Sequence, residues 1–148
     1  MIVNQSSLLK AAPIKGMVQE KRKHLGFSWG LTECGYDIRI KQSVTLFLGR
    51  RFRLASSIEE FDMPHHLMGR VLNKSTWARK GVDASMTTNV EPGWKGFLTI
   101  ELHYKGWKPL TIPAGVGIAQ VIFETIEVPV VYDGKYQNQE DRPVEARG

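Results

Sequence analysis

Residues 97–104 constrain the fold of this chain most tightly, because they alternate strictly between two kinds of side chain. Every second residue of the run FLTIELHY is apolar, from Leu98 to Tyr104, and the residues between are an aromatic, a hydroxyl, an acid and an imidazole. Successive side chains of a strand point to opposite faces, so this period predicts a strand with one face on the core. The other face carries Glu101, and periodicity alone cannot distinguish a solvated acid from a working carboxylate.

Similar short runs recur along the chain, separated by turn signals rich in Gly and Pro. Further strands are expected within YDIRIKQSVTLFLG (36–49), RRFRLASS (50–57), MGRVLN (68–73), ASMTTNV (84–90) and PLTIPAGVGIAQVIFETI (109–126). Turns are expected at 64–66, which contains Pro64 and a His-His pair, and at 91–96, which reads EPGWKG. Many short strands with little helix favour an all-β barrel or sandwich.

Helical signals are few. Residues 6–12, SSLLKAA, predict a short N-terminal helix capped by Ser6 or Ser7 and ended by Pro13. The segment STWARK is compatible with another short helix. Residues 14–30 have no clean period and are expected to form a basic loop, and the polar C-terminal residues 129–148 are expected to fray.

The length of 148 residues suits one domain, with no repeat, linker or second domain visible. Cys34 is the only cysteine, so an internal disulfide is impossible and a reducing, cytoplasmic location is expected, in the host cytoplasm if the source is viral. No run has the length of a membrane span, and the first residues do not resemble a signal peptide. The net charge of +5 suggests an anionic partner such as a nucleotide, although the cations are dispersed.

Several kinds of catalytic site are excluded by missing motifs. A zinc deaminase needs H-x-E and P-C-x-x-C, which one cysteine cannot supply. The four histidines have no metal-ligand spacing, so no metal site is expected within the protein. The sequence also contains neither G-x-S-x-G nor a P-loop.

Two segments remain as candidates for binding chemistry. KSTWAR (74–79) gathers two cations and two hydroxyls, which suits a phosphate, although such hexapeptides are common on protein surfaces. YDGKYQNQ (132–139) lies in the polar C-terminal segment and is either a lid over a ligand or a plain terminus.

Five blocks, taken in order, resemble the dCTP deaminase branch of the dCTP deaminase/dUTPase family. They are GYDIRI (35–40), KSTWARKGV (74–82), EPGWKGFLTIELHY (91–104), PLTIPAGVGIAQVIFE (109–124) and KYQNQ (135–139). The resemblance implies a dUTPase-like, distorted β-barrel of the jelly-roll kind that forms a homotrimer with active sites between subunits. It further implies zinc-independent hydrolysis of dCTP to dUTP and ammonia, with Mg²⁺ accompanying the triphosphate and residues 129–148 acting as a lid.

The resemblance also assigns roles to particular residues. Glu101 falls on the general base that activates water for attack at C4 of cytosine, and Arg79 and Ser75 fall on the other catalytic positions. The triphosphate contacts are expected from Lys74, Ser75, Thr76, Tyr132, Lys135 and Gln139. The base and sugar contacts are expected from Ser85, Thr87, Thr88, Asn89, Glu91 and Trp94.

Departures from the family pattern leave alternatives open. Glu91 stands where the family has an aspartate, the segment between Gly81 and Glu91 is one residue short, and Asn89 replaces arginine or an aromatic. The alternatives are a dUTP diphosphatase, a bifunctional enzyme, or a deaminase of a modified or monophosphate deoxycytidine nucleotide. A further hypothesis is a small basic barrel that binds single-stranded nucleic acid through its four tryptophans. We expect no nucleic-acid partner and no membrane association.

Overall fold

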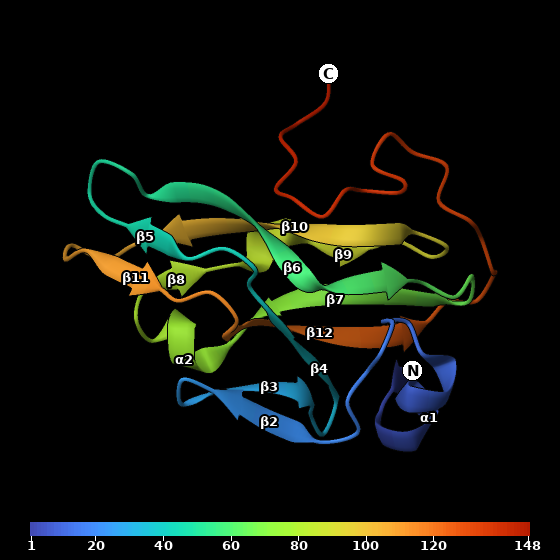
Figure 1. Cartoon of the computed structure of the whole chain (residues 1–148). Coiled ribbons are helices and arrows are strands. Elements are labelled where there is room, and N and C mark those ends of the chain that lie inside the picture. The colour runs from blue at the N-terminus through green and yellow to red at the C-terminus, as the bar shows by residue number, and fades with distance from the viewer.

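The computed structural model describes residues 1–148 and consists mainly of antiparallel strands (Figure 1). One sheet has the order β2-β3-β4-β12-β7-β9, with β1 also paired to β12, and two smaller sheets have the orders β6-β10-β8 and β11-β5. The elements are β1 (Ile2–Val3), α1 (Gln5–Ala11), β2 (Lys21–His24), β3 (Phe27–Leu31), β4 (Gly35–Arg39), β5 (Val44–Leu46), β6 (Phe52–Asp62), β7 (Leu67–Asn73), α2 (Ser75–Ala78), β8 (Val82–Asp83), the 3₁₀ helix η1 (Ser85–Thr87), β9 (Asn89–Val90), β10 (Lys95–Tyr104), β11 (Leu110–Ile112) and β12 (Gly117–Thr125).

The predicted all-β class is confirmed, but the sheets do not close into a continuous barrel. Between the large sheet and the β6-β10-β8 sheet, backbone pairing is reduced to isolated bridges, such as the one that joins Ile40 to Ser57. The core fills the space between the sheets and includes Ile38 and Phe123 from the large sheet.

Strand β10 has the two faces that its alternation predicts. Leu98, Ile100, Leu102 and Tyr104 are all buried, and both Ile100 and Leu102 have no exposed surface. Full burial of such a side chain stabilises the fold by roughly 1.5–3 kcal/mol. The opposite face, with Thr99 and Glu101, is only half-buried. The strand therefore anchors itself in the core and presents its polar residues to the site described below.

The expectation of a basic loop at 14–30 is wrong for its second half, which forms the β2–β3 hairpin. Strand β2 has the sequence KRKH and is exposed along its whole length, so it carries no apolar alternation that would reveal it. Leu25 and Gly26 both have positive φ, 49° and 81°, as a tight two-residue hairpin turn requires. The cations also protect this edge of the sheet from pairing with another chain.

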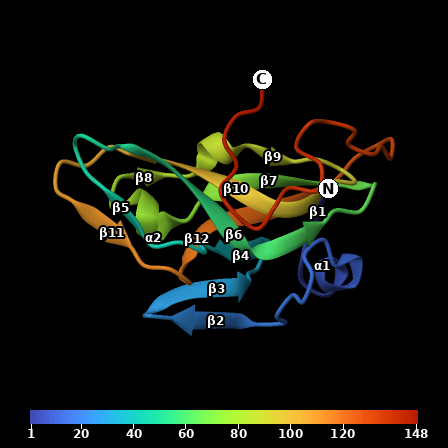
Figure 2. The ribbon, with the colours of Figure 1, turned by 45° about the horizontal axis from the view of Figure 1, so that its top comes forward.

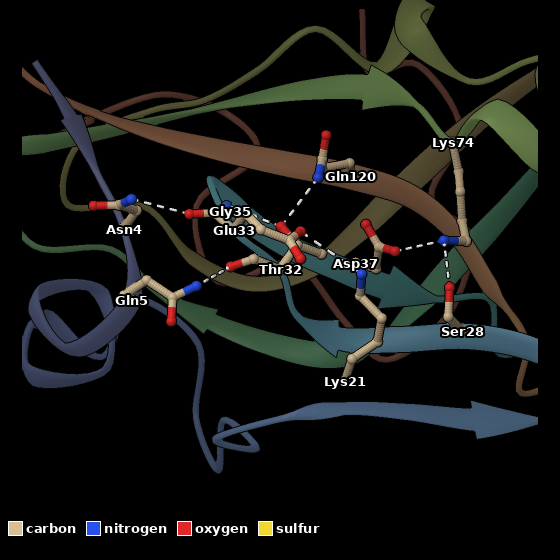
Figure 3. A network of polar contacts seen from close by, with 10 residues as sticks. All are labelled: Asn4, Gln5, Lys21, Ser28, Thr32, Glu33, Gly35, Asp37, Lys74 and Gln120. Atoms are coloured by element: carbon tan, nitrogen blue, oxygen red, sulfur yellow. Dashed lines mark hydrogen bonds and ion pairs between the residues drawn. The ribbon is translucent and has the colours of Figure 1, made fainter.

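The predicted N-terminal helix is present as α1, but its cap is Asn4 and not Ser6 or Ser7. The Asn4 amide does not bond to the helix; it donates to the carbonyl of Glu33 at 2.9 Å, and the Gln5 amide donates to the carbonyl of Thr32 at 2.7 Å (Figure 3). Leu8 is fully buried on the inner face of the helix. These contacts tie the first residues to the turn before β4. None of the helices is long and apolar enough to cross a membrane.

The strand expected over 84–90 is wrong, because only Asn89–Val90 is extended and Ser85–Thr87 forms η1. The cause is local: the Asp83 carboxylate accepts hydrogen bonds from the Ser85 backbone N–H at 2.9 Å and from its hydroxyl at 2.6 Å. An aspartate that bonds the backbone two residues later favours a turn over a strand.

The C-terminal segment, residues 129–148, has no helix or strand but packs back over β10 and β6 (Figures 1 and 2). The Phe97 backbone N–H donates to the Gln139 carbonyl at 3.0 Å, and Gln139 and Val144 are both buried. The expected fraying is therefore wrong for this stretch. Its side chains cover the polar face of β10.

Candidate active site

A cavity of about 490 Å³ lies between the polar face of β10, the η1–β9 segment and the C-terminal segment. Eight of the residues predicted for the site line it together: Thr87, Thr88, Asn89, Glu91, Trp94, Glu101, Tyr132 and Gln139. The remaining lining residues are Phe52, Leu54, Leu98, Thr99, Tyr136, Val144 and Ala146. The cavity thus has a polar wall around η1 and an apolar wall made by β6 and the C-terminal segment.

Glu101 is placed in this cavity by the middle of β10. Its backbone N–H donates to the Thr87 hydroxyl at 3.0 Å, which fixes the strand against η1. Its carboxylate makes no ion pair and no side-chain hydrogen bond within the chain. Burial raises the pKa of this carboxyl, because taking the charged form out of water is unfavourable. A rigidly held, unpaired carboxylate with a raised pKa can accept a proton from water.

The polar wall around η1 contains a strained backbone position. Thr88, which follows η1, has φ 65° and ψ −117°, a conformation that costs a non-glycine residue roughly 1–3 kcal/mol. Thr87 beside it is almost fully buried, and both residues line the cavity. Such strain persists only where the surroundings enforce it. Here the Thr88 carbonyl accepts from the Val71 backbone N–H at 2.8 Å, the Thr88 N–H donates to the Ser85 carbonyl at 3.1 Å, and the Asp83 turn and the bond to β10 hold its neighbours.

Removing the Asp83 carboxylate therefore tests whether it holds the η1 turn in place. The Ser85 hydroxyl and backbone N–H lower the pKa of its carboxyl to about 2. A lowered folded-state pKa means that the ionised form stabilises the fold above about pH 4 and that this contribution is lost as the pH falls through about 2. Asp83→Ala is expected to lower the free energy of unfolding by about 1 kcal/mol at pH 7, as loss of a capping side chain does.

Chemical denaturation of both proteins at pH 7 and again at pH 3 or below measures this difference. The difference in free energy of unfolding between wild type and Asp83→Ala should be smaller at the acidic pH. An equal difference at both pH values would show that the carboxylate's charge does not hold η1. Lys105 pairs with Asp83 at 3.5 Å on the surface, so Lys105→Ala is the control for that ion pair alone.

The C-terminal segment is fastened to the cavity by Thr99. The Thr99 hydroxyl accepts hydrogen bonds from the Gln139 amide and from the Val144 backbone N–H, the latter at 3.0 Å. Trp94 adds a bond from its indole N–H to the Tyr136 carbonyl at 2.6 Å. Thr99 was not among the predicted residues, yet it lies two positions before Glu101 on the same face, so the period of β10 contained the signal. Nothing in the sequence indicates that Val144 and Ala146 reach this cavity.

Lys135 lies in the same segment but does not line the cavity. Its ammonium donates to the carbonyl of Arg147, and the Arg147 backbone N–H in turn donates to the Tyr136 hydroxyl at 3.0 Å. The loop between these residues is therefore closed on itself by Lys135, Tyr136 and Arg147.

A second group of predicted residues lies on and beside α2, outside the cavity. Ser75, Thr76 and Arg79 are exposed, while Trp77 between them is buried and donates to the Gly117 carbonyl at 2.7 Å. Ser85 also lies outside the cavity, bonded to Asp83. One chain thus presents two separate polar groups, an enclosed one around Glu101 and an exposed one on α2.

Lys74, at the start of α2, is held by a polar network on the large sheet (Figure 3). Its ammonium donates to the Asp37 carboxylate at 2.5 Å and to the Ser28 hydroxyl at 2.9 Å, and its side chain is 11% exposed. Nearby, the Gln120 amide donates to the Thr32 hydroxyl at 3.1 Å. Burial raises the pKa of Asp37, because desolvation outweighs the opposing effect of Lys74.

His65 and His66 form the exposed turn that was predicted, and no group of three or more His, Cys, Asp or Glu side chains is arranged to hold a metal. Trp29, Trp77 and Trp94 are buried at 9%, 2% and 5% exposure, whereas Trp107 is 79% exposed. Three of the four tryptophans therefore belong to the core, which argues against a barrel that uses them all to stack nucleic-acid bases.

The sequence is similar to known proteins over most of its length. A family model described as dCTP deaminase-like matches residues 36–126. The dCTP deaminase of Herpetosiphon aurantiacus is 36% identical over 145 residues, covering 76% of this chain and 78% of that protein. The dCTP deaminase of Roseiflexus castenholzii is 33% identical over 159 residues, covering 85% and 86%.

Solved structures of low sequence identity share the fold. The dCTP deaminase of Agrobacterium tumefaciens superposes with a TM-score of 0.62 at 13% identity, covering 85% of this chain and 49% of that one. A mutant dUTPase of Staphylococcus aureus phage phi11, whose structure describes a structural Mg(II) ion, gives 0.59 at 16% identity and covers 82% and 92%. The dUTPase-like fold expected from the sequence is confirmed.

Proposed function

Because this chain belongs to the dCTP deaminase family, we propose that it hydrolyses dCTP to dUTP and ammonia with Glu101 as the general base. The Glu101 carboxylate supports this role, because it is unpaired and half-buried in a cavity that the strained residue Thr88 also lines. Thr87, Thr88 and Asn89 line the cavity beside Glu101, where a pyrimidine would be bound. The site is large enough for a nucleoside and is partly closed by the C-terminal segment.

The reaction moves one proton from water to N3 and a second from the new hydroxyl to the leaving amine, and one carboxylate can relay both in turn. Glu101 takes a proton from water, and the resulting hydroxide attacks C4 of cytosine. Glu101 then delivers that proton to N3 to complete the tetrahedral intermediate. When the C4–N4 bond breaks, ammonia leaves with a proton that Glu101 removes from the new hydroxyl. A dry site and a raised pKa favour this shuttle when no zinc acidifies the water.

Arg79 and Ser75 would contribute to the cavity of a neighbouring subunit in a homotrimer. Both are exposed on α2 and neither lines the cavity of its own chain. A second copy that places its α2 against the open side of the cavity would bring a guanidinium and a hydroxyl to the reacting ring. There they would orient Glu101 and stabilise the developing negative charge.

The triphosphate would extend from the cavity toward the cations and hydroxyls of α2 and the C-terminal segment. Lys74, Ser75, Thr76, Tyr132, Lys135 and Gln139 are the proposed contacts. Lys135 would have to release the Arg147 carbonyl, and Lys74 would have to turn from Asp37. With no carboxylate cluster to hold Mg²⁺ independently, the residues fit an ion held by the phosphates and by water, where it would neutralise phosphate charge.

The acid limb of the pH profile tests the state of Glu101. A base must be deprotonated, so kcat/KM should rise with pH through the Glu101 pKa. Burial raises this pKa above its ordinary value of 4.5, so the midpoint of the limb should lie above pH 4.5. Steady-state rates of ammonia release between pH 4 and pH 8 locate it. A midpoint at or below 4.5 would contradict a desolvated, unpaired base.

One set of incubations distinguishes the proposed reaction from its alternatives. The protein is supplied with dCTP, dCMP or dUTP and Mg²⁺, and ammonia and pyrophosphate are measured separately. Ammonia from dCTP without pyrophosphate supports the proposal. Pyrophosphate from dUTP would indicate a diphosphatase, with Glu91 in the cavity as the carboxylate for that step. Ammonia released from dCMP but not from dCTP would show that the substrate is a monophosphate and that the proposed triphosphate contacts are wrong.

A further inference from the structure

Two hairpin tips that the proposed reaction does not use lie side by side at one end of the molecule (Figures 1 and 2). One is the loop 47–51 between β5 and β6, and the other is the loop 105–109 between β10 and β11. They are neighbours because Leu46 pairs with Leu110 and Phe52 pairs with His103 across the two small sheets. The Tyr104 backbone N–H also donates to the Arg51 carbonyl at 2.9 Å. We call residues 47–51 and 105–109 the hairpin-tip surface.

The hairpin-tip surface is strongly basic. Its sequences, FLGRR and KGWKP, contain four cations and no acid. The only ion pair that any of these cations makes is the one between Lys105 and Asp83, at 3.5 Å on the surface. Arg50 and Lys108 are exposed without a partner. These four cations lie within ten residues and are largely unneutralised.

The same surface displays the one exposed tryptophan of the chain. Trp107 is 79% exposed, and the Arg51 guanidinium lies 5.7 Å from the centre of its ring. Phe47 and Leu48 on the adjacent tip are 38% and 56% exposed. Exposing this much aromatic and aliphatic surface on a loop is unfavourable, so its presence favours a binding role.

The loop that carries Trp107 is held in a defined conformation by a hydrogen bond across it. The buried Tyr104 hydroxyl donates to the Lys108 carbonyl at 2.6 Å, which ties the two sides of the tip together. At Gly106 a side-chain Cβ would lie 2.2 Å from that hydroxyl, so only glycine fits there. The indole ring is therefore presented at a defined position beside the cations.

We propose that the hairpin-tip surface binds single-stranded nucleic acid, with a base stacked on Trp107 and phosphates bound by Arg50, Lys105 and Lys108. An aromatic platform between cations is the combination that single strands require, because every base offers a ring face and every nucleotide a phosphate. The neighbouring β5–β11 ribbon continues the surface with the exposed hydroxyls of Thr45 and Thr111. These polar groups suit a phosphate backbone better than lipid chains. Such binding is separate from the proposed reaction, and it differs from the expectation that the protein has no nucleic-acid partner.

The exposed indole itself provides the measurement. The whole protein is titrated at low salt with an oligothymidylate of about fifteen nucleotides, a length near the upper end of the site size of a small single-strand-binding domain. This probe contains no cytosine to deaminate. The long-wavelength tryptophan emission, which comes from Trp107 because the other three indoles are buried, should be quenched on binding. With three phosphates neutralised, the logarithm of affinity should fall with the logarithm of salt at a slope of about −2.

Variants locate the binding. Trp107→Ala is expected to weaken binding about tenfold, as loss of one stacked base does, and Trp107→Phe should restore most of it. Arg50→Ala should weaken binding and flatten the salt slope, whereas Lys23→Ala, an equal loss of charge on exposed β2, should change little. All four variants should deaminate dCTP as the wild type does, because none lies in the proposed site.

Four results would overturn the proposal. They are an indole emission that the oligonucleotide does not change, an Arg50→Ala variant no weaker than Lys23→Ala, and binding unaffected by Trp107→Ala. The fourth is a blue shift of the Trp107 emission with vesicles of anionic phospholipid, in a protein that does not bind the oligonucleotide. That result would show that the surface binds a membrane.

Discussion

Replacing Glu101 with glutamine is expected to reduce deamination about a thousandfold or more, because the amide cannot accept the proton of the attacking water. General acid–base catalysis contributes about 10²–10⁴ to a rate, and here one group serves several proton transfers. The amide has the shape of the protonated acid, so dCTP should still bind with a similar Kd. Single-turnover rates and equilibrium binding, measured on the same preparation, separate the two effects.

The fold should tolerate this substitution. The Glu101 carboxylate makes no ion pair, and the strand is held by its backbone bond to Thr87 and by the buried residues on its other face. Removing a desolvated charge costs little, so the melting temperature should change by no more than a few degrees. The matched control is Glu60→Gln on the adjacent strand β6, which loses only a surface pair with Lys15 and should keep full activity. Near-normal turnover by Glu101→Gln would show that another group is the base.

The second large effect concerns the exposed group on α2. Arg79→Ala alone should lower kcat about a hundredfold or more, because a cation near the developing charge is lost. If Arg79 serves the cavity of a neighbour, a mixture of Arg79→Ala and Glu101→Gln subunits should regain activity that neither has alone. In randomly mixed trimers with one site at each contact between subunits, about one quarter of the sites combine an intact Glu101 with an intact Arg79.

The mixing experiment uses subunits with two different tags, unfolded together and refolded, so that mixed trimers can be isolated. The matched control replaces the Arg79→Ala partner by the double variant Arg79→Ala, Glu101→Gln, which leaves no complete site in any mixture. Recovery of about a quarter of wild-type activity in the unfractionated mixture, and of about a third in the isolated mixed trimers, supports a shared site. Isolated mixed trimers with no recovered activity would place the whole site within one chain.

The sequence was most informative where one face of a strand is buried. The alternation of 97–104 predicted β10, its buried face and the accessible face of Glu101, because burial selects side chains at a fixed period. The turn expected at 91–96 is present at 92–93, with residues 95 and 96 already in β10, and the short helix after Lys74 is confirmed. In each case the signal is local: the residues that form the element also carry the pattern that reveals it.

The errors arose where the deciding contact lies elsewhere. Strand β2 exists because it pairs with β3, not because its four exposed residues favour a strand. The wall at η1 depends on one carboxylate that bonds two residues ahead, and the packing of 129–148 depends on Thr99 and Trp94, which are distant along the chain. Nor could periodicity separate the residues around Glu101 from those on α2, because that division depends on how the chain folds in space.

If water activated at Glu101 attacks C4 of cytosine, the oxygen atom of that water becomes the C4 oxygen of the uracil product. The most direct test is to supply dCTP in water labelled with heavy oxygen and to locate the label by mass spectrometry while ammonia is measured. One ammonia is expected for each dUTP formed, with one heavy oxygen on the uracil ring and none on the phosphates. Heavy oxygen on the phosphates, with pyrophosphate released in place of ammonia, would show that water attacks the phosphate chain and not C4.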